Sequence, residues 1–310
     1  MDLVSRFYSR EDFHQSLSHA KVMERIGWSS IPIGESRLAV RSLGPVSLAK
    51  MQRSHVIDFP KLLSMRKKLK FVQLVIEPAI TGEFVTSTGK VPFSFASKAQ
   101  SQEAVQIFSA HGFFIGDIHF AHSKTAILDL TPSLLQIQHN FPSKTRYNVT
   151  VSLRKRNVYT ITSFSSLSQK NTEAFFTLHD EWSKERKIFG FSNDFLRTVI
   201  SSFLTEGFVL TCKTDGVLSG VMLVLIHDRI AYYFYTFTSQ MGRKFHVPTG
   251  LTYTAIKLAK EQGADIFDFC SMYDERYPKE YPRWKGFSQF KSRFLPIDIY
   301  YPPTFVRRIL

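Results

Sequence analysis

The order of apolar and polar residues along the 310-residue chain predicts helices and strands in two successive halves. In the first half, helical spacing marks 13–27, 59–69 and 100–111, and β-rich runs mark 28–33, 37–43, 71–76 and 124–130. The run at 71–76 is expected to stop at Glu77-Pro78, because proline cannot continue a central strand. After 124–130, Thr131 is expected to cap a short helix that begins at Pro132 and ends near Pro142.

The second half repeats the pattern more clearly. The predicted strands are 158–161, 208–213, 217–227, 230–238, 266–269 and 297–300, and the predicted helices are 169–186, 193–204 and 249–262. Short turns join the three consecutive strands into a meander. The polar run 143–156 is expected to be a basic joint between the halves. We therefore predict an α/β (α+β) fold with domains 1–145 and 146–310, each a mixed twisted sheet flanked by helices, with a C-terminal segment that could pack back onto the first.

Composition narrows the classes of protein. With 44% hydrophobic residues the chain can bury a sizeable core, and no run of eighteen apolar residues is present to span a membrane. The N-terminus lacks the apolar segment of a signal peptide, which predicts a cytoplasmic protein. The net charge of +14 favours nucleic acid, phosphorylated substrates or peripheral contact with an anionic membrane. Cys212 and Cys270 have no CxxC partner, so neither a zinc site nor a disulfide framework is expected.

Candidate chemistry concentrates in the segment YPRWKGFSQFKSRF, residues 281–294. If a helix opens near Pro282 or Trp284, then Phe287, Phe290 and Phe294 share one face, and Lys291 lies beside that face. A lysine held by aromatic neighbours suits an anionic ligand. The alternative is a lysine that extends from an ordinary amphipathic helix into solvent.

Several runs occur in an order that resembles one known family. They are the strand ILDL, then KTRYN and LRKRNV, the meander TDGVLSGVMLVLIHDRIAYYFYTFTS, the run GLTYTAIKLAKEQGADIFDF and the closing WKGFSQFKSRF, with FHQSLSHAKVMERIGW and FVQLVIEP as weaker echoes in the first half. This order resembles the FemABX family of non-ribosomal peptidyltransferases. The family usually has glycines where this chain has Cys270-Ser271-Met272 and Leu295-Pro296, and the helical hairpin inserted in some members is absent from the sequence.

The resemblance implies two tandem GNAT-like domains and a cytoplasmic enzyme, with the inner face of the membrane as one place where it could act. It would transfer an amino acid from aminoacyl-tRNA to an amine of a nucleotide- or lipid-linked peptidoglycan precursor, as in cell-wall biogenesis and the control of cell shape. Aminoacyl-tRNA would be a co-substrate, and neither a metal nor a cofactor would be needed.

By the same resemblance, Lys291 holds the substrate phosphate or the developing oxyanion, and Phe290 positions it. Asp268, at the end of a central strand, could orient or deprotonate the incoming amine, because sites in open sheets gather at strand ends. A turn aspartate with satisfied hydrogen bonds is the equally open alternative.

Four further residues are candidates for substrate binding. Lys144 and Arg146 lie in the family's KTR run and could bind phosphate, or they could form a linker salt bridge. Arg283 and Trp284 belong to the closing segment.

Two other functions compete with this one. The first is an acyl-CoA-dependent GNAT N-acyltransferase that modifies an envelope polysaccharide or peptide. Its coenzyme loop needs glycines that cradle pyrophosphate, whereas the bulky residues of 240–250 count against such a loop. The second is a non-catalytic nucleic-acid-binding protein, which would need exposed aromatic platforms.

Overall fold

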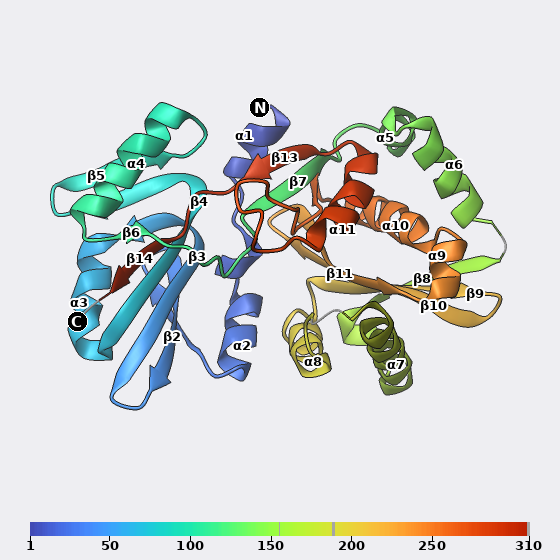
Figure 1. Cartoon of the computed structure of the whole chain (residues 1–310), viewed down its shortest axis with the longest axis horizontal. Coiled ribbons are helices and arrows are strands. Elements are labelled where there is room, and N and C mark those ends of the chain that lie inside the picture. The colour runs from blue at the N-terminus through green and yellow to red at the C-terminus, as the bar shows by residue number, and fades with distance from the viewer. Residues whose placement is uncertain (155, 188–189, 309–310) are drawn as a thin grey trace. The chain divides into compact units, whose positions relative to one another are not determined.

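The computed structural model (Figure 1) describes residues 1–154, 156–187 and 190–308. Lys155, which belongs to the basic run 143–156, lies outside the described residues. The chain divides into two units, one formed by Met1–Ser123 with Tyr300–Leu310 and the other by Lys124–Ile299. No helix among the described residues is long and apolar enough to cross a membrane.

The first unit is a mixed sheet with helices packed against it. Its strand order is β1-β2-β3-β4-β14-β6, and β5 pairs with β4. The strands are β1 (Ser29–Ile33), β2 (Ser36–Leu43), β3 (Val46–Asp58), β4 (Phe71–Thr86), β5 (Gly89–Ser94), β6 (Phe114–Ile115) and β14 (Phe305–Arg308). The helices are α1 (Leu3–Tyr8), η1 (Phe13–Gln15), α2 (Leu17–Arg25), α3 (Phe59–Leu69) and α4 (Lys98–Ala110). Helix α3 connects the parallel pair β3 and β4.

An aromatic core fills this unit. Phe59 at the start of α3 stacks on Phe84 of β4 with ring centroids 5.4 Å apart. Phe108 of α4 stacks on Phe305 of β14 at 3.6 Å, and all four rings are fully buried. The last strand of the chain therefore supplies a central part of the first core.

Strand β4 corrects the prediction that the 71–76 run stops at Glu77-Pro78. Pro78 lies opposite Ser54, where the register between β3 and β4 shifts on both sides of Ser54. Arg53, just before, has a left-handed backbone with φ 54°. This bulge removes the need for a ladder hydrogen bond from the proline nitrogen, so the strand continues to Thr86.

The second unit contains a sheet in the order β13-β7-β12-β11-β10-β9-β8. The strands are β7 (Lys124–Asp129), β8 (Asn157–Ser163), β9 (Gly207–Thr214), β10 (Val217–His227), β11 (Ile230–Thr238), β12 (Ile266–Asp268) and β13 (Ile297–Tyr300). The helices are α5 (Leu134–Asn140), α6 (Ser143–Ser152), η2 (Phe164–Ser166), α7 (Gln169–Arg186), α8 (Asn193–Ser202), α9 (Gln240–Lys244), α10 (Val247–Glu261), α11 (Trp284–Lys291) and η3 (Ser292–Phe294).

Helix α10 crosses from β11 to the parallel strand β12 and packs its apolar side on one face of the sheet. Helices α7 and α8 lie on the other side of the sheet (Figure 1). The predicted meander is confirmed, because β9, β10 and β11 pair antiparallel in sequence. The predicted α/β fold with mixed sheets and flanking helices is likewise confirmed.

Three details of the connection between the halves differ from expectation. The run 143–152, part of the expected basic joint, forms α6, and Ser133 rather than Thr131 caps α5 through a capping box with Gln136. The sequence places the domain boundary between residues 145 and 146. However, β7 pairs with β12, so the second unit already starts at Lys124.

Candidate active site

Helix α11 and the end of β12 bring Lys291 together with a tight turn of the backbone. The Lys291 ammonium donates hydrogen bonds to the carbonyl oxygens of Cys270, at 2.9 Å, and Ser271, at 3.3 Å. It also lies 4.9 Å from the ring centroid of Tyr233 and 4.7 Å from that of Phe287. Only 4% of Lys291 is exposed, so it is not the solvent-facing lysine of the alternative interpretation.

The turn that presents these carbonyls has a left-handed backbone. Cys270 has φ 51° and Ser271 has φ 35°, and both stand where the FemABX pattern usually has glycine. A left-handed conformation costs a non-glycine residue roughly 1–2 kcal/mol. The chain thus keeps a glycine-type geometry without glycine, at the point where two carbonyls meet one ammonium.

Asp268, the last residue of β12, stabilises this turn by hydrogen bonding. Its side chain is completely buried. Its Oδ1 accepts a 2.6 Å hydrogen bond from the Cys270 amide and a second hydrogen bond from the Thr125 hydroxyl of β7. These contacts connect Asp268 to Lys291 through Cys270. The expectation that Asp268 orients or deprotonates an amine stays a prediction.

Burial sets the protonation of Lys291. Desolvation lowers the pKa of Lys291 to about 8, although Cys270 and Asp268 act in the opposite direction. At neutral pH the side chain therefore carries its positive charge, in a position where little water screens it. A charge of this kind can stabilise an oxyanion or a phosphate.

The rest of α11 divides into a buried and an open side. Phe290 is half-buried, packs against the core of the unit and meets Phe294 edge-on, with ring centroids 5.6 Å apart. Phe287 is partly exposed, although the sequence places it on the same apolar face. Trp284 stacks on Tyr281, with centroids 4.2 Å apart and the planes within 14°.

The predicted phosphate ligands have other contacts. The Arg146 guanidinium donates to the carbonyl oxygens of His139 and Phe141, at 2.9 and 2.6 Å, and so caps the end of α5. The Arg283 guanidinium donates to the Lys187 carbonyl at 2.7 Å, at the end of α7. Lys144 is exposed on the first turn of α6.

Helix α6 nevertheless lies close to the Lys291 region. Thr145, between Lys144 and Arg146, donates a 3.0 Å hydrogen bond to the Arg293 carbonyl, two residues after Lys291. Among the described residues, no hydrogen bond or ion pair joins Lys144 or Arg146 directly to Lys291.

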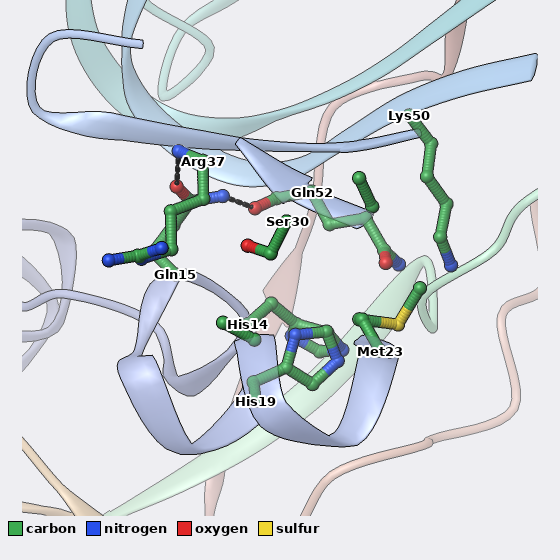
Figure 2. A pocket seen from close by; sticks show the side chains of 10 residues that line it. His14, Gln15, His19, Met23, Ser30, Arg37, Lys50 and Gln52 are labelled. Atoms are coloured by element: carbon green, nitrogen blue, oxygen red, sulfur yellow. Dashed lines mark hydrogen bonds between the residues drawn. The ribbon is translucent and has the colours of Figure 1, made fainter. Parts of the chain in front are cut away.

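The first unit contains a pocket that the sequence did not reveal (Figure 2). Its walls come from η1, α2 and strands β1 to β3, and it opens to solvent. Lys50 reaches into it, with the ammonium 5.0 Å from the ring centroid of Trp28 and 5.3 Å from that of Phe120. Among the described residues, Lys50 forms no ion pair. Burial lowers its pKa, which Glu77 partly opposes.

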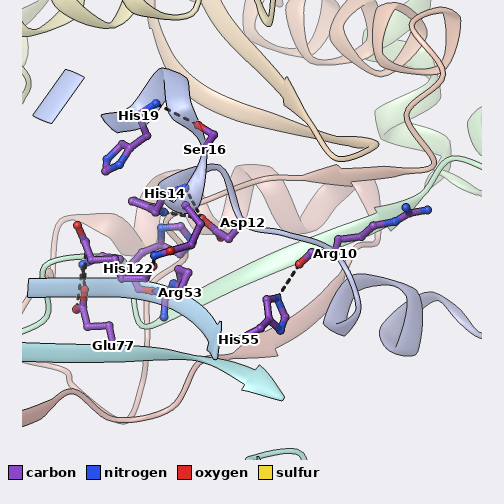
Figure 3. Close-up of polar contacts among 12 residues, drawn as sticks. Arg10, Asp12, His14, Ser16, His19, Arg53, His55, Glu77 and His122 are labelled. Carbon is purple, nitrogen blue, oxygen red and sulfur yellow. Dashed lines mark hydrogen bonds and ion pairs between the residues drawn. The ribbon is translucent and has the colours of Figure 1, made fainter. Parts of the chain in front are cut away.

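Buried polar groups support this pocket (Figure 3). The His14 ring nitrogen Nδ1 lies 2.6 Å from the Asp12 carboxylate. Burial would raise the pKa of Asp12, but the charge and hydrogen bonds of His14, with help from Arg53, outweigh it and lower that pKa. Burial lowers the pKa of His19 well below its ordinary value. Nearby, the Glu77 carboxylate accepts the amide of Phe120 at 2.6 Å.

Sequence reasoning could find Glu77 only through the run FVQLVIEP, and it had no signal for the rest of this cluster. Residues 12, 14, 19, 50 and 77 come from four separate segments, and their patterns are those of ordinary helices and strands. The described residues contain no group of three or more His, Cys, Asp or Glu side chains that could hold a metal ion.

Comparisons with known proteins agree with this fold. Residues 143–281 match the sequence model of the Acetyltransferase (GNAT) domain. No curated protein sequence matches the chain. A crystal structure of FemX superposes over 98% of this chain and 94% of its own, with 14% identity and a TM-score of 0.77.

Two other solved structures are similar. One is the C-terminal domain of a putative lysylphosphatidylglycerol synthetase from Agrobacterium fabrum, with 12% identity, a TM-score of 0.58 and coverage of 98% of this chain and 90% of its own. The other is a tandem GNAT protein from the clavulanic acid biosynthesis pathway, with 13% identity, a TM-score of 0.51 and coverage of 88% and 78%. The matched domain and the shared fold support an acyltransferase of the GNAT type. The fold is therefore that of a tandem GNAT-like protein, as the sequence predicts.

Proposed function

We propose that the protein is an aminoacyltransferase that moves an amino acid from aminoacyl-tRNA to an amine of a peptidoglycan precursor. The observation that carries the proposal is the buried, positively charged Lys291, held by two carbonyl oxygens at the end of a central strand. The FemX likeness supports the substrate class. The reaction needs no metal and no cofactor beyond the aminoacyl-tRNA itself.

The reaction requires the protein to align the two substrates and to stabilise the negative charge of the tetrahedral state. An aminoacyl ester already carries a good leaving group, so an amine attacks its carbonyl directly and the tRNA hydroxyl leaves. Negative charge develops on the carbonyl oxygen in the tetrahedral state. The Lys291 ammonium, oriented by Cys270 and Ser271, would stabilise that charge, and alignment of the two substrates supplies the rest of the rate enhancement.

The first-unit pocket supplies a candidate site for an anionic part of the acceptor. Lys50 is held between two aromatic rings and has no ion pair among the described residues, and His14 and His19 line the same pocket. A phosphate group is the ligand that such a set of donors favours.

An acyl-CoA-dependent GNAT N-acyltransferase is the second candidate, favoured by the match to the acetyltransferase domain. The local geometry counts against it. Where a coenzyme loop would lie, residues 240–244 form α9, and the amide of Gly242 already donates to the Ser239 hydroxyl. Gly250 packs against the Tyr159 hydroxyl, and Pro248 has no amide to offer at the start of α10. Few amides are left to cradle a pyrophosphate.

A donor comparison tests the proposal. Purified protein is mixed with a muropeptide acceptor and either radiolabelled aminoacyl-tRNA or radiolabelled acetyl-CoA, and transfer is followed in a single turnover. We expect label to move from aminoacyl-tRNA and not from acetyl-CoA. Transfer from acetyl-CoA alone would replace the proposal with the second candidate, and transfer from neither donor would contradict both.

A further inference from the structure

Three aromatic side chains form a ladder on the open side of α11. We call Tyr281, Trp284 and Phe287 the aromatic ladder. Tyr281 stacks on Trp284, and the rings of Trp284 and Phe287 follow with centroids 5.6 Å apart. The Phe287 ring then lies 4.7 Å from the Lys291 ammonium. The ladder therefore runs along the helix and ends at the candidate catalytic lysine.

Exposure separates this ladder from the core. Tyr281 is 40% exposed and Phe287 is 36% exposed, whereas Phe294, at the end of the segment, is fully buried. A helix whose only task was to cover the sheet would turn such rings inward. Tyr281 and Phe287 instead keep part of their ring surface in contact with solvent.

The charges beside the ladder are mainly positive. Arg283 and Lys285 flank Trp284 in sequence, and the Lys285 ammonium lies 4.9 Å from the ring centroid of Tyr273. Of the nearby acids, Asp274 pairs with Arg276 and Glu275 with Lys124, whereas Glu280 directly precedes Tyr281. Stacked rings with cations at their edges are the arrangement that binds single-stranded nucleic acid, because every base offers a π face and every linkage a phosphate.

We propose that the aromatic ladder binds the unpaired 3′ nucleotides of aminoacyl-tRNA by base stacking and so leads the terminal ester to Lys291. This inference rests on the proposed function. The dimensions agree, because the seven residue steps from Trp284 to Lys291 span about 10 Å of helix. Two to three stacked nucleotides, at about 3.4 Å each, cover the same length. Lys285 would then contact a phosphate.

A binding experiment separates stacking from catalysis. A fluorescent single-stranded RNA that ends in CCA and carries no amino acid is titrated with wild-type protein and with Trp284→Ala. Loss of one stacking platform is expected to weaken binding roughly tenfold. Trp284→Phe should recover most of the affinity, because a ring is restored.

Salt dependence distinguishes the two kinds of contact. Trp284→Ala should leave the slope of log affinity against log salt unchanged, whereas Lys285→Gln should reduce it by about 0.7, the value for one phosphate contact on a single strand. Tyr147→Ala, which removes a more exposed aromatic residue from α6 of the same unit, is the matched control and should bind normally.

Several outcomes would overturn the inference. They are absence of RNA binding by the wild-type protein, equal affinity of Trp284→Ala, or equal weakening by Tyr147→Ala. A Trp284→Ala variant that keeps RNA binding but loses sedimentation with phosphatidylglycerol vesicles would assign the ladder to a membrane surface instead. Normal RNA binding through the ladder without any aminoacyl transfer would contradict the proposed function and leave the stacking site in place.

Discussion

Lys291 is a positive charge placed where burial works against it. The two carbonyls of the turn and the adjacent rings compensate for the lost water, but the lowered pKa of about 8 shows that compensation is incomplete. A group poised near neutral pH is typical of functional sites. Its protonation should therefore control the reaction.

We expect the single-turnover transfer rate to fall as pH rises through about 8, because the ammonium that stabilises the oxyanion loses its proton there. Lys291→Ala should fold and lose roughly a hundred- to a thousandfold in rate. Lys291→Arg should recover little, because a planar guanidinium does not replace a compact ammonium between two carbonyls. A rate that climbs above pH 8 would instead identify Lys291 as a base, and wild-type turnover by Lys291→Ala would remove it from the site.

The lowered pKa of Lys291 also makes the stability of the protein depend on pH. The folded protein releases the Lys291 proton near pH 8, whereas the unfolded chain keeps it to about 10.4. Between these values the unfolded state binds more protons, so Lys291 contributes stability that increases with pH. Between pH 7 and pH 10, the free energy of unfolding measured in urea should increase more for the wild type than for Lys291→Ala.

Asp268→Asn tests whether that carboxylate acts on Lys291 or on the substrate. In the native protein the negative charge of Asp268 raises the pKa of Lys291. Asn keeps an oxygen for the Cys270 amide but removes that charge, so the pKa of Lys291 should fall. The alkaline limb of the rate profile should therefore move to lower pH, with activity retained below it. Thr125→Val, which removes a hydrogen bond and no charge, is the control. Complete loss of activity at every pH would favour Asp268 as the base for the amine.

The sequence named Lys291 and Asp268 as candidates, because motif and periodicity are both local properties, and the structure connects the two through Cys270. It did not predict that Cys270 and Ser271 would adopt left-handed geometry, since these residue types ordinarily avoid it. The Lys50 pocket could also not be predicted from the sequence. Its lining residues are spread from His14 to Gln52, and only the fold collects them.

At the scale of elements, regular apolar spacing was enough to predict helix bounds, whereas a local irregularity such as a β-bulge could not be predicted. Helices α3 and α7 have the predicted bounds, because their apolar spacing is regular. Strand β3 was not predicted from the sequence, although most of its residues pack in the sheet. Strand β4 was cut short at Pro78, because a bulge in its partner strand leaves no trace in the β4 sequence.

The end of η3 allows a test of backbone strain. Leu295 has φ 51° and is 57% exposed, so its side chain contributes little burial. Leu295→Gly should raise the free energy of unfolding by about 0.5–1 kcal/mol, because relief of the left-handed strain exceeds the added chain entropy. Leu135→Gly, at an exposed helical position of α5, should lower it by about 1 kcal/mol. The urea midpoints of the two variants, at unchanged slopes of the transition, measure both changes in stability. Equal destabilisation by Leu295→Gly and Leu135→Gly would refute the strain argument.

For the whole molecule, the net charge of +14 makes a prediction about tRNA. If the excess contacts phosphates, log affinity should fall linearly with log salt, by roughly 0.7–0.9 for each phosphate contact. Titration of labelled tRNA at several salt concentrations measures this slope. An affinity that stays flat from low to physiological salt would remove the electrostatic contribution.

The place of β14 also orders events during protein synthesis. Phe305 completes the first core, yet it leaves the ribosome only after every residue of the second unit. The nascent first unit therefore keeps the edges of β4 and β6 open until β14 has been synthesised. For this chain, the half whose synthesis begins first cannot complete its core until synthesis of the other half has ended.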